Sequence, residues 1–268
     1  MTSTAPFRWQ GGEAYERYVG RWSRLVAREF VRWLDVRAGA RFLDVGCGTG
    51  ALTETLLEVA EPAEVVGVDP SEGYVAHARA HVTDPRATFL VGDAEKIPFD
   101  DASFDAAASA LVFNFVPDPL RAVAEAARVV ADHSTVAAYV WDYTGRMELM
   151  RHFWDAAVEL EPSAASLDEG RRFAICEPSA LERLFTRAGL ADVETQEITV
   201  RTVFRDFDDY WQPFLSGEAP APGYAMSLDE NRRTTLRERL RTRLPTRPDG
   251  SIRLAARAWA IRGSKKGP

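Results

Sequence analysis

The stretch Leu-Asp-Val-Gly-Cys-Gly-Thr-Gly occupies residues 43–50 and joins an apolar run to an amphipathic one. The apolar run, residues 41–45, is typical of a buried strand because it ends in glycine. The amphipathic run is typical of a helix, because it places three leucines on one face, Leu52, Leu56 and Leu57. Glycines let the backbone turn tightly and approach a ligand, since no Cβ intervenes. The stretch predicts a strand, a ligand-binding turn and a helix capped by Thr49.

The spacing of the glycines distinguishes two kinds of nucleotide-type site. Dinucleotide-binding turns read G-x-G-x-x-G and hold a pyrophosphate at the helix N-terminus. This turn reads G-x-G-x-G at Gly46, Gly48 and Gly50, and Asp44 stands two residues before the first glycine. A carboxylate there would oppose a pyrophosphate but suits a ligand that carries an ammonium and a sulfonium. The pattern therefore favours S-adenosylmethionine over a nicotinamide cofactor.

Two further strand-like runs, residues 64–68 and 87–91, are each followed by an aspartate. Asp69 stands roughly 20 residues beyond the turn, which is where folds of this kind bind ribose hydroxyls. Asp93 follows the second run, and its carboxylate could accept a hydrogen bond from an adenine amino group. Each aspartate also has a plainer interpretation: Asp44 as a turn or capping carboxylate, Asp69 as an Asx turn, and Asp93 as a loop acid.

Four segments in this order resemble the class I S-adenosylmethionine-dependent methyltransferases. The likeness is strongest to the branch of ubiquinone and menaquinone biosynthesis methyltransferases and small-molecule natural-product methyltransferases. The segments are LDVGCGTG (43–50), GVDPSEGYVAHAR (67–79), GDAEKIPFDDASFD (92–105) and AAASALVFNFVPDP (106–119). They lie within residues 40–142. A single glycine turn would be weak support, but four motifs in order are specific.

The resemblance implies which residues hold the cofactor. The turn and the first aspartate would face the methionine part, Asp69 the ribose, and Asp93 with the backbone of Ala94 the adenine. Cys47 would contribute its backbone rather than its thiol. The residues assigned to the cofactor are Asp44, Gly46, Cys47, Gly48, Gly50, Asp69, Pro70, Asp93, Ala94 and Ser109.

Residues 7–34 are expected to be helical and are rich in aromatic side chains, namely Phe7, Trp9, Tyr15, Tyr18, Trp22, Phe30 and Trp33. In related enzymes such a segment folds over the cofactor, so Tyr18 and Arg21 are candidates to bind the methionine carboxylate. A helix that only covers the sheet is the alternative.

The alternation of strands and helices predicts an α/β fold with a doubly wound, mostly parallel sheet, which the resemblance makes seven-stranded. Strands are expected at 41–45, 64–68, 87–91, 104–112, 134–141, 193–204 and 252–261, and helices at 51–60, 72–82, 119–131 and 178–188. The expected parts are a helical cap (1–36), the cofactor-binding core (37–142, 178–204 and 251–268) and two insertions (143–177 and 205–250).

The two insertions are too long for idle connections and carry many aromatic side chains, among them Tyr143, Phe153, Trp154, Phe173, Tyr210, Trp211, Phe214 and Tyr224. We expect them to form a helical lid that excludes water and positions the methyl acceptor. The alternative is that the aromatic residues are only the lid's own small core.

Methyl transfer from a sulfonium depends mostly on alignment of the acceptor, and a general base is needed only for a protonated acceptor. Candidates for that base are Asp142, Tyr143 and His152, of which His152 titrates in the right range but lies on a stretch that also suits a structural residue. Asn114 and Trp141 are candidates to contact the acceptor.

No metal site is expected. His77 and His81 have the spacing of two metal ligands on a helix, but the sequence offers no third ligand.

Composition narrows the partners. With 33 Lys and Arg against 40 Asp and Glu, the formal net charge is −7, so a nucleic-acid partner is not expected. The arginine-rich residues 232–247 read as a solvated helix. No apolar stretch is long enough to span a membrane, and residues 1–10 lack the order of a secretory signal. Two cysteines, Cys47 and Cys176, form no disulfide framework, which favours a reducing cytoplasm. The oligomeric state stays open.

The sequence thus favours a methyltransferase that moves a methyl group from S-adenosylmethionine, leaving S-adenosylhomocysteine. The acceptor would be the oxygen or carbon of a small, partly apolar molecule, aromatic molecules included. Enzymes that methylate base or glutamine amides carry an Asn/Asp-Pro-Pro-Tyr turn, and Ser109-Ala110-Leu111-Val112-Phe113 stands here instead. Two alternatives stay open: a catalytically silent S-adenosylmethionine-binding sensor or scaffold, and a nicotinamide-dependent oxidoreductase, which the glycine spacing disfavours.

Overall fold

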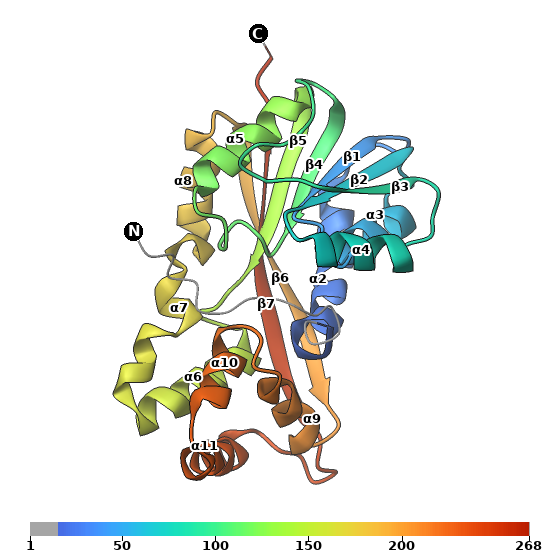
Figure 1. Ribbon diagram of the computed structural model, residues 1–268. Coiled ribbons are helices and arrows are strands. Elements are labelled where there is room, and N and C mark those ends of the chain that lie inside the picture. The colour runs from blue at the N-terminus through green and yellow to red at the C-terminus, as the bar shows by residue number, and fades with distance from the viewer. Residues whose placement is uncertain (1–15, 268) are drawn as a thin grey trace. The chain divides into compact units, whose positions relative to one another are not determined.

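A computed structural model describes residues 16–267 of the chain. Seven strands form one sheet in the order β3-β2-β1-β4-β5-β7-β6 (Figure 1). The strands are β1 Arg41–Val45, β2 Glu64–Asp69, β3 Ala87–Val91, β4 Phe104–Ala110, β5 Val130–Trp141, β6 Ala191–Phe204 and β7 Ile252–Ser264. Pairs from β3 to β5 are parallel, and β7 pairs antiparallel with β5. The predicted doubly wound, mostly parallel α/β fold is confirmed.

The described residues divide into two compact units. The core unit comprises residues 23–141, 175–198 and 258–267, and the insertion unit comprises residues 16–22, 142–174 and 199–257. Strands β6 and β7 supply residues to both units.

The core unit carries helices against its strands. They are α3 Ala51–Val59, α4 Glu72–His81, α5 Pro119–Val129, α8 Pro178–Arg187 and most of α2 Arg21–Leu34. Helices α3 and α4 pack against β2 and β3, whereas α5 packs against β4 and β5 with α8 beside it (Figure 1). The amphipathic pattern predicted this packing, because α3 buries the three leucines of its apolar face.

Strand β1 lies inside the sheet, between β2 and β4, and is buried on both faces. Phe42 and Leu43 are fully buried, and Asp44 lies opposite Gly67 of β2 and Ala108 of β4. In parallel strands the carboxyl ends share one edge of the sheet. The glycine turn, the end of β2 and the end of β4 therefore meet at that edge, where such folds bind ligands.

Apart from its residues of β6 and β7, the insertion unit is helical. Its elements are η1 Glu16–Gly20, α6 Glu148–Leu160, η2 Pro162–Ser166, α7 Glu169–Arg172, α9 Phe207–Trp211, η4 Gln212–Leu215, α10 Pro220–Ser227 and α11 Glu230–Arg243. The rings of Phe153 and Phe214 stack at 4.5 Å in its interior. Helix α11 buries Leu236 and Leu240, as expected for a solvated helix with one apolar face.

Several local expectations differ from the structure. Thr49 does not cap α3: the N-cap is Gly50, at φ +92°, and no side chain bonds the cap. Strand β4 ends at Ala110, before Leu111 turns to φ +62°. Strand β5 begins at Val130, four residues earlier than expected, because a register shift lets it pair with Phe104.

The aromatic N-terminal segment is described only in part. Residues 16–20 form one π-helical turn and residues 21–34 an α-helix. Phe7, Trp9 and Tyr15 lie outside the described residues. Within residues 16–267, no helix combines the length and the apolar character needed to cross a membrane.

Candidate cofactor site

The glycine turn after β1 is held against the end of β2 by backbone hydrogen bonds. The amides of Gly46 and Cys47 both donate to the carbonyl of Val68, at 2.8 and 3.0 Å. The amide of Gly48 donates to Asp69 Oδ2 at 3.1 Å. The first two residues of the turn therefore take their position from the backbone of β2, and the third from the carboxylate of its last residue.

Two glycines of the turn have different surroundings. A Cβ at Gly46, where φ is +75°, would lie 2.7 Å from Val112 Cγ1, so only glycine fits the backbone and the space. A Cβ at Gly48 would have no atom of the described residues within 4 Å. The turn is closed on the side of the loop after β4 and open over Gly48, where a ligand can approach the backbone.

Asp44 is completely buried at the end of β1. Thr53 Oγ1 donates to its Oδ2 at 2.7 Å, whereas Oδ1 has no hydrogen-bond partner within residues 16–267. Burial raises the pKa of Asp44 from 3.8 to about 7, against the lowering effect of the Thr53 hydrogen bond. An unpaired oxygen on a buried acid is suited to a ligand ammonium, which would supply both the hydrogen bond and the charge.

Thr53 was not among the residues picked from the sequence. The available signal was a hydroxyl on the apolar face of α3, where Thr53 is fully buried. A buried hydroxyl needs a partner, and here that partner is Asp44.

The carboxylate of Asp69 accepts two backbone hydrogen bonds and can accept more from a ligand. Its Oδ1 accepts from the amide of Ser71 at 2.9 Å, which is the Asx-type contact considered as the plainer interpretation. Its Oδ2 accepts from Gly48. Burial raises the pKa of Asp69, and both backbone hydrogen bonds oppose that rise. Each carboxylate oxygen has a second lone pair, so ribose hydroxyls can still donate to it. Pro70 beside it is exposed.

Asp93 lies on the surface in the segment between β3 and β4. Its Oδ1 accepts from the amide of Glu95 at 2.8 Å, while Ala94 next to it is buried. Asp93 Oδ2 thus belongs to an exposed carboxylate, and the next residue along the chain, Ala94, is buried. The loop-acid interpretation and the adenine-binding one both agree with it.

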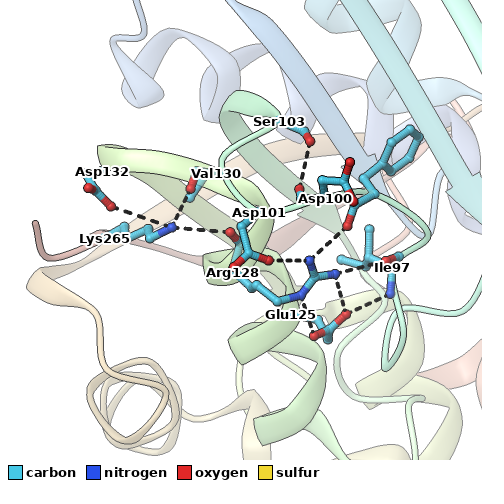
Figure 2. Close-up of polar contacts among 10 residues, drawn as sticks. Ile97, Asp100, Asp101, Ser103, Glu125, Arg128, Val130, Asp132 and Lys265 are labelled. Atoms are coloured by element: carbon cyan, nitrogen blue, oxygen red, sulfur yellow. Dashed lines mark hydrogen bonds and ion pairs between the residues drawn. The ribbon is translucent and has the colours of Figure 1, made fainter. Parts of the chain in front are cut away.

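The segment that carries Asp93 is anchored by Arg128 of α5 (Figure 2). The guanidinium donates to the carbonyls of Ile97 at 3.0 Å and Phe99 at 2.9 Å, and to the carboxylate of Asp101 at 2.8 Å. It also pairs with Glu125, and this pairing lowers the pKa of Glu125. A planar fork with five N–H donors can hold all these groups at once.

The residues around Arg128 make further contacts. Glu125 accepts from the amide of Ile97 at 3.0 Å. Lys265 Nζ donates to the carbonyl of Val130 at 2.8 Å and to that of Arg128 at 3.3 Å (Figure 2). Arg128 was not a predicted site residue, and its contribution is to hold the segment rather than to touch a ligand.

Ser109 and Cys47 take structural positions near the turn. Ser109 is buried, and its hydroxyl donates to the carbonyl of Val45 at 2.8 Å, which ties β4 to the end of β1. Cys47 is buried, and burial raises the pKa of its thiol. A Cβ at Gly67 would lie 2.8 Å from Cys47 Cβ, so the side chain fills space in the sheet. The Cys47 amide donates to the carbonyl of Val68, and the Cys47 carbonyl accepts from the amide of Gly50 at 2.8 Å. The expected contact between the Cys47 backbone and a ligand stays a prediction.

Tyr18 and Arg21 lie in the insertion unit. Tyr18 is buried with its ring edge toward Phe214 at 5.5 Å, and its hydroxyl has no partner among the described residues. Arg21 Nη1 donates to Asp209 Oδ1 at 3.2 Å. Both residues still carry buried donors that nothing in residues 16–267 accepts. Their proposed contact with the methionine carboxylate stays a prediction.

The three candidate bases also belong to the insertion unit, and Asp142 is fully engaged there. Arg257 donates to its Oδ2 from Nε at 2.7 Å, and the amides of Gly145 and Arg146 donate at 3.0 and 2.8 Å. Thr144 adds a hydroxyl contact at 3.3 Å. These contacts engage both carboxylate oxygens, and the proposed role of Asp142 as a base stays a prediction. Its contacts suit a residue that holds the chain after β5.

Tyr143 and His152 remain candidates. Tyr143 is buried against the ring of Phe173, 5.6 Å away. His152 is half-buried on α6, and burial lowers its pKa, with nearby charges of both signs acting as smaller effects. A lowered pKa favours the neutral imidazole, which is the form that can accept a proton.

Glu169 is a buried acid that the sequence did not single out. It is 2 % exposed, and the indole N–H of Trp154 donates to its Oε2. Burial raises its pKa from 4.5 to about 7. Only tertiary packing buries this residue, because it follows Asp168 and precedes two arginines in a polar segment. No local pattern marked it.

In the described part of the chain, no three His, Cys, Asp or Glu side chains gather as a metal site. The rings of His77 and His81 stack at 3.9 Å, and His81 Nδ1 lies 2.8 Å from the carbonyl of His77. The two histidine rings therefore stack on each other, and His81 contacts the backbone of its own helix.

Comparison with known proteins places this geometry in a family. The model of a family described as a methyltransferase domain matches residues 43–138. An uncharacterized methyltransferase of Mycobacterium tuberculosis is 44% identical over 117 residues, which are 44% of each chain. The chain thus spans less than half the length of that relative. A ubiquinone biosynthesis O-methyltransferase of Thiobacillus denitrificans is 31% identical over 180 residues, 64% of this chain and 73% of the relative.

A solved structure shows the same fold. Phosphoethanolamine N-methyltransferase 2 of Haemonchus contortus, in complex with S-adenosyl-L-methionine, aligns with a TM-score of 0.58 and 18% identity, over 95% of this chain and 56% of that one. Taken with the glycine turn and the buried Asp44, these likenesses lead to one conclusion. The chain belongs to the class I S-adenosylmethionine-dependent methyltransferases, whose cofactor is S-adenosylmethionine.

Proposed function

We propose that the protein transfers a methyl group from S-adenosylmethionine to the oxygen or carbon of a small, partly apolar acceptor. The observation that carries the proposal is Asp44, whose buried Oδ1 lacks a partner in the described chain beside a glycine turn that is open over Gly48. An ammonium suits that oxygen, and the pyrophosphate of a nicotinamide cofactor does not.

The chain's own residues would bind and orient the cofactor. The Asp44 carboxylate would accept from the methionine ammonium, Asp69 from the ribose hydroxyls, and Asp93 from the adenine amino group. When bound, S-adenosylmethionine would supply an electrophilic methyl group, and the electrons of the broken C–S bond would stay on sulfur. The proton of the acceptor would pass to water or to one of the candidate bases. The protein's task is to hold the acceptor in line near the methyl carbon.

The nature of the acceptor is supported by the sequence and by one relative. The turn used by enzymes that methylate base or glutamine amides is replaced by apolar residues at 110–113. The Thiobacillus denitrificans relative is by its name an O-methyltransferase. The first observation disfavours an amide nitrogen as the methylated atom, and the second favours oxygen, with carbon as the second choice.

The insertions 143–177 and 205–250 are our candidates for a lid over the acceptor. Their length and their aromatic side chains support this. A structure with acceptor bound, in which neither insertion contacts the acceptor, would contradict it. We also propose a cytoplasmic location, because Cys47 and Cys176 are both buried thiols.

The proposal is tested by calorimetric titration with S-adenosylhomocysteine. We expect the wild type to bind with a Kd on the order of micromolar or below, and Asp69→Ala to lose most of that affinity. Asp132→Ala is the matched control, since Asp132 is an exposed aspartate at the start of β5. Equal affinity in all three proteins would reject the assignment of Asp69. Wild-type protein that binds NAD⁺ more tightly than S-adenosylhomocysteine would reject the function.

A further inference from the structure

Asn114 lies in the loop between β4 and α5, in the core unit, and its side chain is buried without a hydrogen bond. The residue is 8% exposed, and neither Nδ2 nor Oδ1 has a partner anywhere in residues 16–267. A carboxamide offers two N–H donors and an acceptor oxygen, and leaving them unpaired in the interior opposes folding. Buried polar groups in this state call for an explanation, and a ligand would provide one.

Asn114 follows a core residue and lies within a hydrogen-bonded turn, although Phe115 after it is 43% exposed. Phe113 is 1% exposed and meets the ring of Phe185 at 6.5 Å. The amide of Phe115 donates to the carbonyl of Val112 at 2.8 Å, which closes a turn around Asn114. The backbone of Asn114 is thus held within this turn, next to a core residue.

The same loop contacts the glycine turn. The Val112 side chain occupies the space that a Cβ at Gly46 would need. The loop leaves the carboxyl end of β4, which is next to β1 in the sheet, and ligands of parallel sheets bind at such ends. Asn114 therefore stands two residues from a direct contact with the cofactor turn, within one unit.

The cofactor has no evident use for this amide. Its ammonium, ribose hydroxyls and adenine amino group are each matched by an aspartate, namely Asp44, Asp69 and Asp93. Tyr18 and Arg21, which carry unpaired buried donors within residues 16–267, are the candidates for its carboxylate. A methyl transfer has one other substrate, the acceptor, which must be held in line with the methyl carbon. An amide beside the turn is placed to hold it.

We propose, on the basis of the proposed function, that Asn114 binds the methyl acceptor. Its Nδ2 donates to an oxygen of the acceptor, and its Oδ1 accepts from a hydroxyl of the acceptor. The class of acceptor is a neutral molecule that carries a hydroxyl next to a second hydroxyl or a carbonyl. An amide is uncharged and cannot compensate a buried ammonium or carboxylate, so charged acceptors are disfavoured at this position.

The experiment compares a neutral with two charged forms of one acceptor skeleton. Methyl 3,4-dihydroxybenzoate is the neutral probe, 3,4-dihydroxybenzoate the anionic one and dopamine the cationic one. Methylated products are quantified by mass spectrometry with wild type, Asn114→Leu and Asn114→Asp. Asn231→Asp is the matched control, because Asn231 is exposed on α11. Affinity for S-adenosylhomocysteine and the melting temperature are measured for each protein.

We expect the wild type to prefer the neutral probe. We expect Asn114→Leu to keep its affinity for S-adenosylhomocysteine and its melting temperature, while kcat/KM for that probe falls about tenfold or more, as the loss of a buried hydrogen bond implies. Asn231→Asp should match the wild type. Asn114→Asp should also lose activity, since it replaces two donors by a negative charge.

Three results would overturn the inference while leaving the proposed function intact. One is wild type that binds S-adenosylhomocysteine but methylates none of the probes. Another is an Asn114→Leu variant with unchanged kcat/KM. The third is a variant that loses stability and cofactor affinity together, which would show that the amide is structural. Failure of the wild type to bind S-adenosylhomocysteine would reject the proposed function itself.

Discussion

The protonation of a single residue, Asp44, should make ligand binding at the cofactor site depend on pH. Burial raises its pKa to about 7, so the acid is largely protonated in mildly acidic solution. Only the carboxylate can pair with a ligand ammonium. Binding therefore has to remove a proton from Asp44 whenever the pH is below that pKa.

We expect the affinity for S-adenosylhomocysteine to fall as the pH decreases below about 7, by up to about tenfold per pH unit. Calorimetric titrations between about pH 5.5 and 8 would measure this. Asp44→Asn should bind weakly and with little dependence on pH. A variant that keeps the wild-type pH dependence would show that another group is responsible.

Glu169 makes a corresponding prediction for stability in the insertion unit. Its pKa is about 7 in the folded chain against an ordinary value of 4.5, because it is buried. The folded chain therefore binds the proton more tightly than the unfolded chain. The free energy of unfolding then decreases as the pH rises from about 4.5 to about 7, and this loss is complete above that range.

Glu169→Gln removes this titration but keeps an oxygen that can accept from Trp154. When the pH is raised from about 5 to about 8, we expect the difference in free energy of unfolding between variant and wild type to change by on the order of 2 kcal/mol in favour of the variant. Urea denaturation at both pH values would measure the gain. Glu29→Gln on the exposed face of α2 is the control. A gain that does not depend on pH would refute the assigned cause.

At the scale of elements, the glycine turn and the loop after β4 constrain each other. Gly46→Ala should destabilise the protein, because φ is +75° and the new Cβ would meet Val112. The backbone part costs about 1–2 kcal/mol. Adding Val112→Ala makes room for the new Cβ and should recover about 1 kcal/mol of the loss. Thermal denaturation of the two single variants and the double variant measures the coupling; strict additivity would contradict the contact.

The sequence predicted those elements whose signals are local. The glycine turn, the aspartates at or just beyond the carboxyl ends of β1, β2 and β3, and the leucine face of α3 are each encoded within a few residues. The start of β5 was missed because it depends on pairing with Phe104 of a neighbouring strand. The cap of α3 was missed because a left-handed Gly50 replaced the expected hydroxyl of Thr49.

The candidate site divides in the same way, into residues with a local sequence signal and contacts that depend on distant residues. Its aspartates stand in recognisable motifs, whereas their environments arise from packing. Asp142 was named from its place after β5, whereas its contact with Arg257, 115 positions away, arises only from packing. The buried acid Glu169 carries no local signal. Long-range partners decide whether a carboxylate is free to react, and a local pattern cannot supply them.

For the whole molecule, the two units are interleaved along the chain. The insertion unit consists of three separate segments, and β6 and β7 supply residues to both units. Neither unit is a continuous stretch that could fold before the other is complete. We expect one cooperative transition in differential scanning calorimetry, which S-adenosylhomocysteine moves as a whole to higher temperature. Two peaks, only one of which shifts, would contradict this.

The buried Cys47 makes the cofactor turn a reporter of its own opening. An alkylating reagent reacts with an exposed thiolate, and burial raises the pKa of this thiol. Modification therefore requires the turn to open locally. The rate of alkylation at Cys47 counts such openings, with the buried Cys176 as an internal reference. S-adenosylhomocysteine should slow the alkylation of Cys47 and leave that of Cys176 unchanged. The Cys47 thiol would then report how often the cofactor turn opens.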